Sequence, residues 1–264
     1  MKLGIISDIH GNIHALRAVL EALDNASVDL IVCAGDLVCC GANHNLVIRQ
    51  IRQRHIPTVT GHYDAAVAWG HPVASYSRLS SQAEFLQRAA LAWTNQYVLA
   101  EDKAFLQTLP WRLNYNIDGK HVVMLHGGLD RLDESFTPSN PTGLQHLAEQ
   151  LQADIVILGH SHVPFTYGCH HSQGQTLFIN PGSVGHSHDG DPRASYALLD
   201  TRTDSVQFAR ANYNIEAAAR AIAVSGMPIE IAEMIRQGVA VEDLMLQSPA
   251  VSTYGHQRLQ PAFA

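Results

Sequence analysis

Five short clusters of aspartate and histidine stand out because their residue types and spacing are those of metal ligands. Each cluster follows a short apolar run, and in chain order they are Asp8 with His10, Gly35-Asp36, Gly61-His62-Tyr63-Asp64, His126-Gly127 and Gly159-His160-Ser161-His162. Carboxylate oxygens and imidazole nitrogens, with no cysteine among them, suit Mn, Fe, Zn, Ni or Co. The clusters offer more ligands than one ion needs, so they indicate two ions.

A site for two ions needs a carboxylate between them, because such ions lie about 3.5–4 Å apart. Asp36, on a turn of its own, is the natural candidate for this bridge, and Asp8 and His10 would then hold the first ion. The glycines beside Asp36, His126 and His160 have a geometric reason, since glycine permits the sharp turns that a crowded site requires.

The clusters must be positioned by the elements that precede them. Apolar runs at residues 3–7 and 30–34 are each followed by an amphipathic helical pattern, the second at residues 46–54, and a third run at residues 57–60 follows. Strands that alternate with helices predict a parallel sheet. Strand ends at one edge of such a sheet face a common crevice, so clusters far apart in sequence can converge.

Later strand signals predict a second sheet, with a helix at residues 142–151. These signals lie at residues 121–125, 154–158, 176–179 and 195–199. Beyond residue 212 we expect two short helices, followed by a tail from about residue 247 that lacks any periodicity.

The segment at residues 70–116 interrupts the strand signals. It predicts a helix at residues 81–96, with Phe85, Ala89 and Trp93 on one face, and a shorter helix at residues 102–109. Two interpretations stay open for this segment, namely a helical cap beside the site and ordinary core packing.

Composition limits the function classes. The chain has 264 residues, 46% of them hydrophobic, and a net charge of −7, which fits one domain with an added subdomain. An acidic surface excludes general nucleic-acid binding through counterion release. The four cysteines match no zinc or disulfide framework, so we interpret them as reduced thiols. No apolar run is long enough for a signal peptide or a membrane span, and we expect a cytoplasmic protein.

The order of the clusters resembles that of the calcineurin-like metallophosphoesterases: D-x-H, G-D, G-N-(H/D) with its variants, H-G and G-H-x-H. The segments GDLVCCGANHNLVIRQIRQRHIPTVTG and INPGSVGHSHDGDPRASYALLD are similar to the bacterial branch related to small phosphodiesterases and diadenosine tetraphosphate hydrolases. The resemblance covers about residues 1–215. It implies a four-layer α/β/β/α sandwich with a helical insertion at about 70–116, and leaves residues 216–264 as C-terminal helices and a tail.

The resemblance also implies ligand roles and a reaction. Asp8, His10, Asp36 and His162 resemble the ligands of one ion, and Asp36, His126 and His160 resemble those of the other. The implied reaction is attack on phosphorus by a metal-bound hydroxide, with both ions stabilising the charge of the transition state.

Three positions depart from the family pattern. His62 stands where an asparagine ligand is usual, so it either replaces that ligand or leaves the second ion weaker. Tyr63 stands where many relatives carry a histidine that protonates the leaving group. Because tyrosine has a pKa near 10, it is a poorer proton donor, which favours diesters and phosphoanhydrides over monoesters. His186-Ser187-His188 replaces Gln-Pro-Arg, which indicates altered substrate contacts.

The sequence therefore predicts a metal-dependent enzyme that hydrolyses phosphodiesters or nucleotide phosphoanhydrides, with catalytic roles for Asp36, His62 and Tyr63. Its substrate would be a small phosphate ester or nucleotide. One alternative is a diadenosine polyphosphate hydrolase, which needs room for two nucleosides. Another is a non-catalytic protein-interaction scaffold, because one retromer subunit has this fold. The oligomeric state stays open.

Overall fold

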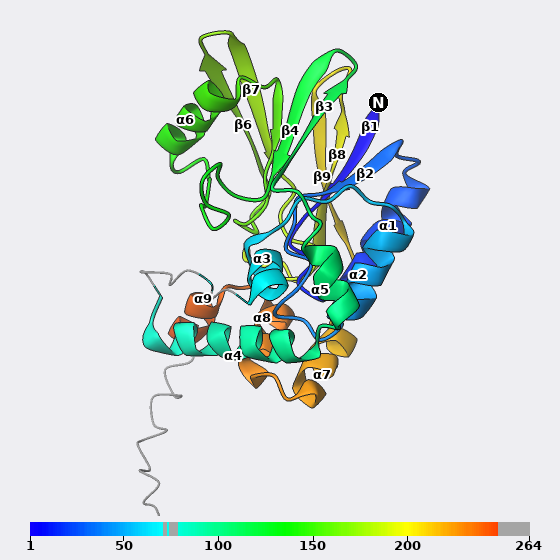
Figure 1. Ribbon diagram of the computed structural model, residues 1–264, viewed down its shortest axis with the longest axis vertical. Coiled ribbons are helices and arrows are strands. Elements are labelled where there is room, and N and C mark those ends of the chain that lie inside the picture. The colour runs from blue at the N-terminus through cyan, green and yellow to red at the C-terminus, as the bar shows by residue number, and fades with distance from the viewer. Residues whose placement is uncertain (71–72, 74–78, 248–264) are drawn as a thin grey trace, which may run out of the picture.

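The computed structural model describes residues 1–70, 73 and 79–247, which form two stacked β-sheets with helices on both outer faces (Figure 1). The first sheet has the order β2-β1-β8-β9, with β1 (Lys2–Ile6), β2 (Leu30–Cys33), β8 (Ala194–Asp200) and β9 (Ser205–Ala211). The second has the order β3-β4-β5-β7-β6, with β3 (Arg112–Ile117), β4 (Lys120–Leu125), β5 (Ile155–Ile157), β6 (Phe165–His171) and β7 (Gly174–Asn180).

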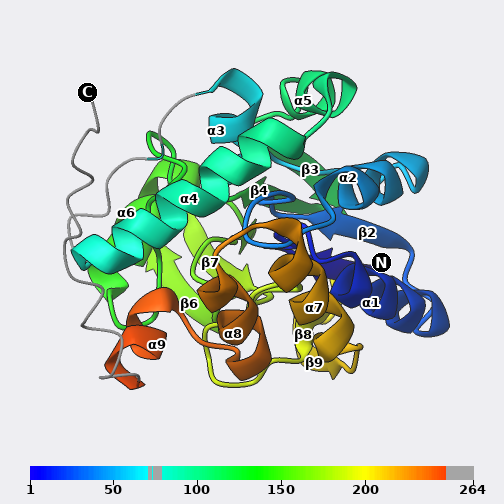
Figure 2. The ribbon, with the colours of Figure 1, turned by 90° about the horizontal axis from the view of Figure 1, so that it is seen from below.

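The helices fall into an outer set and a set below the strand ends. The outer helices are α1 (Ile13–Asn25) and α2 (His44–Gln53) on one side and α6 (Pro141–Leu151) on the other. The lower set, seen from below in Figure 2, comprises α3 (His62–Trp69), α4 (Ser81–Tyr97), α5 (Ala100–Leu106), α7 (Ile215–Ser225), α8 (Ile229–Gln237) and α9 (Val241–Gln247). Among the described residues no helix is long and apolar enough to cross a membrane.

Alternation along the strands divides the core into layers. In β4, Val122 and Met124 pack between the two sheets with Leu3 and Ile5 of β1. The intervening side chains of β4 point the other way and pack with the buried face of α6. Burial of each such aliphatic side chain stabilises the fold by about 1.5–3 kcal/mol. Because successive side chains point to opposite faces, both faces of the sheet are packed in this way. The predicted four-layer sandwich is confirmed.

Two strand predictions were wrong. The signal at residues 195–199 belongs to β8, which pairs antiparallel with β1 and so joins the first sheet rather than the second. The run at residues 57–60 makes only an isolated bridge from Thr58 to Cys33. Pro57 lacks an N–H group, and the Thr60 N–H bonds to the Pro110 carbonyl, so no ladder continues.

Three strands were not predicted, namely β3, β6 and β9. All three are edge strands, and each pairs antiparallel with its one neighbour. These three strands carry polar residues among their apolar ones and so lack the apolar run that marks a central strand. The fourth edge strand, β2, has such a run and was predicted.

The helix predicted at residues 81–96 exists as α4, and Trp93 of the predicted face packs against the core, but Phe85 of that face does not. Phe85 is 67% exposed, whereas Ala83, Leu86 and Ala90 of the same helix are buried. Gln87 of α4 borders the cavity at the strand ends. The segment thus both packs in the core and lies beside the candidate site. The tail expected beyond residue 247 lies outside the described residues.

Backbone hydrogen bonds tie the loops that follow β1, β2 and β7 to one another. The Asp8 N–H donates to the Gly35 carbonyl over 2.9 Å, and the His10 N–H donates to the Asp36 carbonyl over 3.0 Å. From the third loop, the Gly185 N–H donates to the Asp8 carbonyl over 3.0 Å. These cross-links make the three loops one connected layer beneath the strand ends.

Gly185 is needed where this layer is tightest. A Cβ at this position would lie 1.8 Å from the Ile9 carbonyl oxygen, so Gly185→Ala must displace backbone. We expect a loss of about 1–3 kcal/mol in the free energy of unfolding, measured by urea denaturation. The control is Gly168→Ala in β6, where nothing lies within 4 Å of the added Cβ. Equal stabilities of the two variants would contradict the prediction.

Candidate metal centre

The five sequence clusters converge at the lower strand ends. Four of them follow β1, β2, β4 and β5, as expected, while the cluster at 61–64 begins helix α3 instead of ending a strand. The side chains of Asp8, His10, Asp36 and His126 are fully buried. The clusters border a cavity of about 290 Å³ that His10, His62, Tyr63, His160 and His162 line together with residues of α4, α8 and α9.

Five of the candidate ligands adopt a left-handed backbone conformation that non-glycine residues rarely use. Their φ values are 53° at Asp8, 48° at His10, 53° at Asp36, 66° at His160 and 59° at His162. Such conformations cost about 1–3 kcal/mol each and persist only where the surroundings impose them. The cross-linked loops impose them here, and the turns direct the side chains toward a common centre.

The first group of ligand atoms contains two imidazoles that face each other. His10 Nε2 lies 3.0 Å from His162 Nε2. His10 Nδ1 faces the Val38 carbonyl at 3.1 Å, and His162 Nδ1 faces the carbonyl of His186. A carbonyl can only accept, so each Nδ1 carries the hydrogen and each Nε2 of a neutral ring presents a lone pair. Two lone pairs at this distance require a cation or a proton.

Asp36 Oδ2 lies between this group and a second one. It is 3.8 Å from His10 Nε2, 2.9 Å from His62 Nδ1 and 3.3 Å from His126 Nε2. His126 Nδ1 donates to the Ala34 carbonyl over 2.8 Å, which leaves Nε2 of the neutral ring as an acceptor. Within the described part of the chain Asp36 Oδ2 accepts no well-aligned hydrogen bond. A buried carboxylate oxygen in this situation fits a metal ion.

His160 belongs to the second group, whereas Asp8 lies beside the first. Ring nitrogens of His62, His126 and His160 lie within 4.8 Å of one another. His160 N–H donates to Asp8 Oδ2 over 3.1 Å, and Asp8 Oδ1 lies 3.4 Å from His162 Nε2. The structure thus brings all seven predicted metal-ligating residues together.

Charges inside the site shift several pKa values. Burial alone would raise the pKa of Asp36, but His62 and His126 more than offset it and hold that pKa well below its usual value. Burial opposes protonation of His126, yet Asp36 raises its pKa to about 9. His10 also has a pKa raised to about 9, against its burial, through contact with Cys40 and the carboxylates.

Asp64 supports the site without lining it. Its Oδ1 accepts hydrogen bonds from Leu37 N at 2.8 Å and Val38 N at 3.2 Å, and its Oδ2 accepts one from Gly61 N at 3.0 Å. Asp64 thereby joins the start of α3 to the loop after β2. Burial and the nearby Asp36 charge raise its pKa to about 7.

The side chains that line the cavity but were not predicted as site residues include His186 and Cys40. Both are buried, and both line the cavity beside His10. The signal for His186 was its departure from the family pattern, which indicated only altered substrate contacts. Cys40 gave no signal because its loop carries it to the site. All four cysteines are free of disulfide bonds, as expected for reduced thiols.

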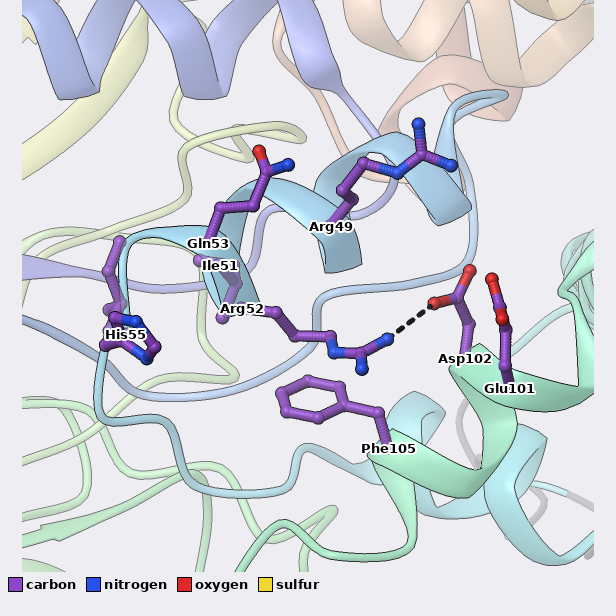
Figure 3. A pocket seen from close by; sticks show the side chains of 9 residues that line it. Arg49, Ile51, Arg52, Gln53, His55, Glu101, Asp102 and Phe105 are labelled. Atoms are coloured by element: carbon purple, nitrogen blue, oxygen red, sulfur yellow. Dashed lines mark ion pairs between the residues drawn. The ribbon is translucent and has the colours of Figure 1, made fainter.

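A second cavity lies between α2 and α5 and has a volume of about 500 Å³ (Figure 3). Arg52 there points toward Asp102 at 3.6 Å, and its guanidinium lies 5.3 Å from the centre of the Phe105 ring. The guanidinium of Arg52 is therefore already paired with a carboxylate. The larger cavity lacks the convergent ligand atoms of the smaller one.

Metal binding at this centre should release protons. His10 and His126 both have metal-free pKa values of about 9, so both are protonated at about pH 7.5 and must lose a proton to bind an ion. We expect calorimetric titration with Zn²⁺ to show a heat that depends on the ionisation enthalpy of the buffer. The apparent affinity should rise with pH and level off above about pH 9. A heat independent of the buffer would contradict this, and exposed His121→Gln should leave the release unchanged.

Comparison of the sequence and the fold with known proteins identifies the family of this chain. The sequence profile of the calcineurin-like phosphoesterase superfamily domain matches residues 1–204. The chain is 28% identical to phosphodiesterase YfcE from Escherichia coli over 209 residues, which cover 78% of this chain and 91% of that protein. It is also 28% identical over 253 residues to an uncharacterized protein from Methanocaldococcus jannaschii, covering 89% and 98% of the two chains.

Solved structures agree. A metallophosphoesterase from Sphaerobacter thermophilus is 29% identical, with a TM-score of 0.74 and coverage of 90% of this chain and 99% of that one. A hypothetical protein from Pyrococcus horikoshii, 20% identical with a TM-score of 0.75 and coverage of 90% and 98%, shares the fold. Because the family profile spans residues 1–204 of 264, this chain belongs to the calcineurin-like phosphoesterase superfamily.

Proposed function

We propose that this protein is a dinuclear metal-dependent phosphoesterase that hydrolyses phosphodiesters or nucleotide phosphoanhydrides. The observation that carries the proposal is Asp36 Oδ2, a buried carboxylate oxygen that lies within 3.8 Å of imidazoles from both ligand groups. One ion would be held by Asp8, His10, Asp36 and His162, and the other by Asp36, His62, His126 and His160. Oxygen and imidazole ligands suit Mn, Fe, Zn, Ni or Co.

When bound, the two ions would neutralise the phosphate and lower the pKa of the attacking water. The protein's own contribution is orientation. The backbone carbonyls of Val38 and Ala34 hold the imidazoles of His10 and His126 with Nε2 toward the centre. The Tyr63 N–H donates to Asp36 Oδ1 over 2.9 Å, which leaves Oδ2 to face both groups. The site is thereby organised before a substrate arrives.

His62 lies among the candidate ligands of the second group. Its Nδ1 lies 2.9 Å from Asp36 Oδ2 and 3.1 Å from His126 Nε2. This distance places a ring nitrogen among the other candidate ligand atoms, which supports replacement of the usual asparagine by imidazole. We therefore include His62 among the ligands of the second ion.

We expect Tyr63 to contact the leaving group. The side chain is 6% exposed, lines the cavity, and packs beside His62 with ring centres 4.1 Å apart. A phenol can donate a hydrogen bond to the departing oxygen but protonates a basic alkoxide poorly. Esters with good leaving groups are the substrates that this arrangement favours.

The cavity argues for a small substrate. Its volume of about 290 Å³ is at the lower end of the range of about 300–1,000 Å³ for ligand pockets. Within the described ranges this leaves little room for the two nucleosides of a diadenosine polyphosphate. A protein-interaction scaffold would have no use for strained, buried ligands, which cost stability.

The domain limits form part of the proposal. Residues 1–215 would make up the catalytic domain. Helix α4, from the insertion at 70–116, and helices α8 and α9, from residues 216–264, would cover its cavity, since residues of all three line it.

Activity should depend on added metal and on Asp36. Metal-stripped protein refilled with Mn, Ni, Co or Fe should hydrolyse bis-p-nitrophenyl phosphate faster than p-nitrophenyl phosphate or diadenosine tetraphosphate. Asp36→Asn should lower kcat/KM by about 100-fold or more, because it removes the shared charge. Exposed Asp204→Asn, in the turn between β8 and β9, is the matched control. Inactivity of the wild type with every bound metal would favour the scaffold alternative, and a preference for the monoester would contradict the argument from Tyr63.

A histidine at position 63 should extend the reaction to poorer leaving groups. Tyr63→His supplies a donor whose ordinary pKa is about 6.5, so alkyl esters should gain rate relative to p-nitrophenyl esters. Tyr63→Phe, which keeps the ring but removes the hydroxyl, should lower the rates of hydrolysis of both alkyl and p-nitrophenyl esters. Measurement of kcat against leaving-group pKa checks this, and parallel plots for the wild type and Tyr63→His would refute it.

A further inference from the structure

His186 lies against the first ligand group, although it follows β7 rather than any of the five clusters. Its side chain is 4% exposed and lines the cavity beside His10 and His162. One ring nitrogen from each of these three histidines lies within 4.8 Å of the other two. His186 Nε2 is buried and has no hydrogen-bond partner among the described residues.

The backbone on both sides of this imidazole is anchored to the candidate ligands. His186 N–H donates to Ser183 Oγ over 2.8 Å, and that hydroxyl donates to the Asp8 carbonyl over 2.7 Å. The His186 carbonyl accepts from His162 Nδ1. His186 thus orients the predicted ligand His162 through its backbone carbonyl, and its own imidazole lines the same cavity.

A cation would compensate the ring nitrogens of His10, His162 and His186 together. In their neutral rings, His10 Nε2 and His162 Nε2 present lone pairs to each other at 3.0 Å, and His186 brings a third ring nitrogen nearby. A buried ring nitrogen without a partner is costly unless an ion, water or ligand meets it. A metal ion among the three imidazoles would meet these groups together.

We propose that His186 is a further protein ligand of the ion held by Asp8, His10, Asp36 and His162. This inference rests on the proposed function, since it adds to that site. With three imidazoles beside two carboxylates, the site would favour Zn, Ni or Co over Mn more strongly than a site with two imidazoles. His188 does not share this role. Its Nε2 is also buried without a hydrogen-bond partner in the described residues, but its ring stacks on His162 with centres 4.0 Å apart. Among the described residues it belongs to none of the ligand groups, so the grouping of ring nitrogens separates it from His186.

The test compares metal binding by the wild type, His186→Gln and His188→Gln. Metal-stripped proteins are titrated with Co²⁺ against a chromophoric chelator, and the visible absorption of bound Co²⁺ is recorded. We expect two sites in the wild type. His186→Gln should weaken one site by about tenfold or more and change its absorption spectrum, whereas His188→Gln should keep both affinities within about threefold.

Each outcome decides between the two proposals. Unchanged affinities and spectrum in His186→Gln would overturn the ligand role of His186 and leave the proposed function standing. Equal losses in His186→Gln and His188→Gln would also overturn it, since the effect would then belong to the loop. A wild type that binds no Co²⁺ would overturn both proposals.

A measurement on the wild type covers the case in which His186→Gln does not fold, which circular dichroism would reveal. In protein labelled with ¹⁵N-histidine, adding Zn²⁺ should move one ring-nitrogen resonance of His186 to the range of metal-bound imidazole. A resonance of His186 that does not move while those of His10 and His162 do would overturn the proposal.

Discussion

A buried carboxylate oxygen, Asp36 Oδ2, sets the condition that the surrounding structure meets. A charge in the interior is costly unless opposite charge or hydrogen bonds compensate it. Here the Tyr63 N–H compensates the other oxygen, Oδ1, while Oδ2 faces imidazoles from the loop after β1, the start of α3 and the loop after β4. Protons on His10 and His126 can balance the charge without metal, and cations can replace those protons. The buried carboxylates are therefore stable only together with positive charge, which protons on these histidines or bound cations can supply.

The fold delivers this assembly through close contact between loops. Gly61 has no room for a side chain, since a Cβ there would lie 2.1 Å from Asp36 Oδ1. Asp64 holds the adjacent helix start by bonding to Leu37 and Val38. The strained backbone at the candidate ligands is compatible with a stable protein because the two sheets bury a large apolar core between them. Stability from the core thus balances strain at the site.

The cover of the cavity has a different chemistry from its floor. Aspartates and histidines form the floor, whereas Ile231 and Met234 of α8 and Val241 of α9 contribute apolar wall. An apolar wall next to a polar floor suits an ester whose phosphate meets the floor and whose organic group meets the wall. The helices that follow the sandwich in sequence thus contribute part of the cavity wall.

Local sequence determined much of this protein, because a ligand cluster after an apolar run can be recognised without knowing its neighbours. The seven ligand candidates and the central strands follow from such patterns. The order of the clusters led to the family resemblance, and that resemblance implied the sandwich. Tertiary structure decided what depends on contacts between distant segments. It placed β8 beside β1 in the first sheet, since pairing partners leave no mark in a single strand. It also turned the loop after β7 so that His186 lies beside His10, more than 170 residues away in sequence. The edge strands β3, β6 and β9 and the buried face of α4 escaped prediction for the same reason: their burial is set by what packs against them, and only the folded chain specifies that.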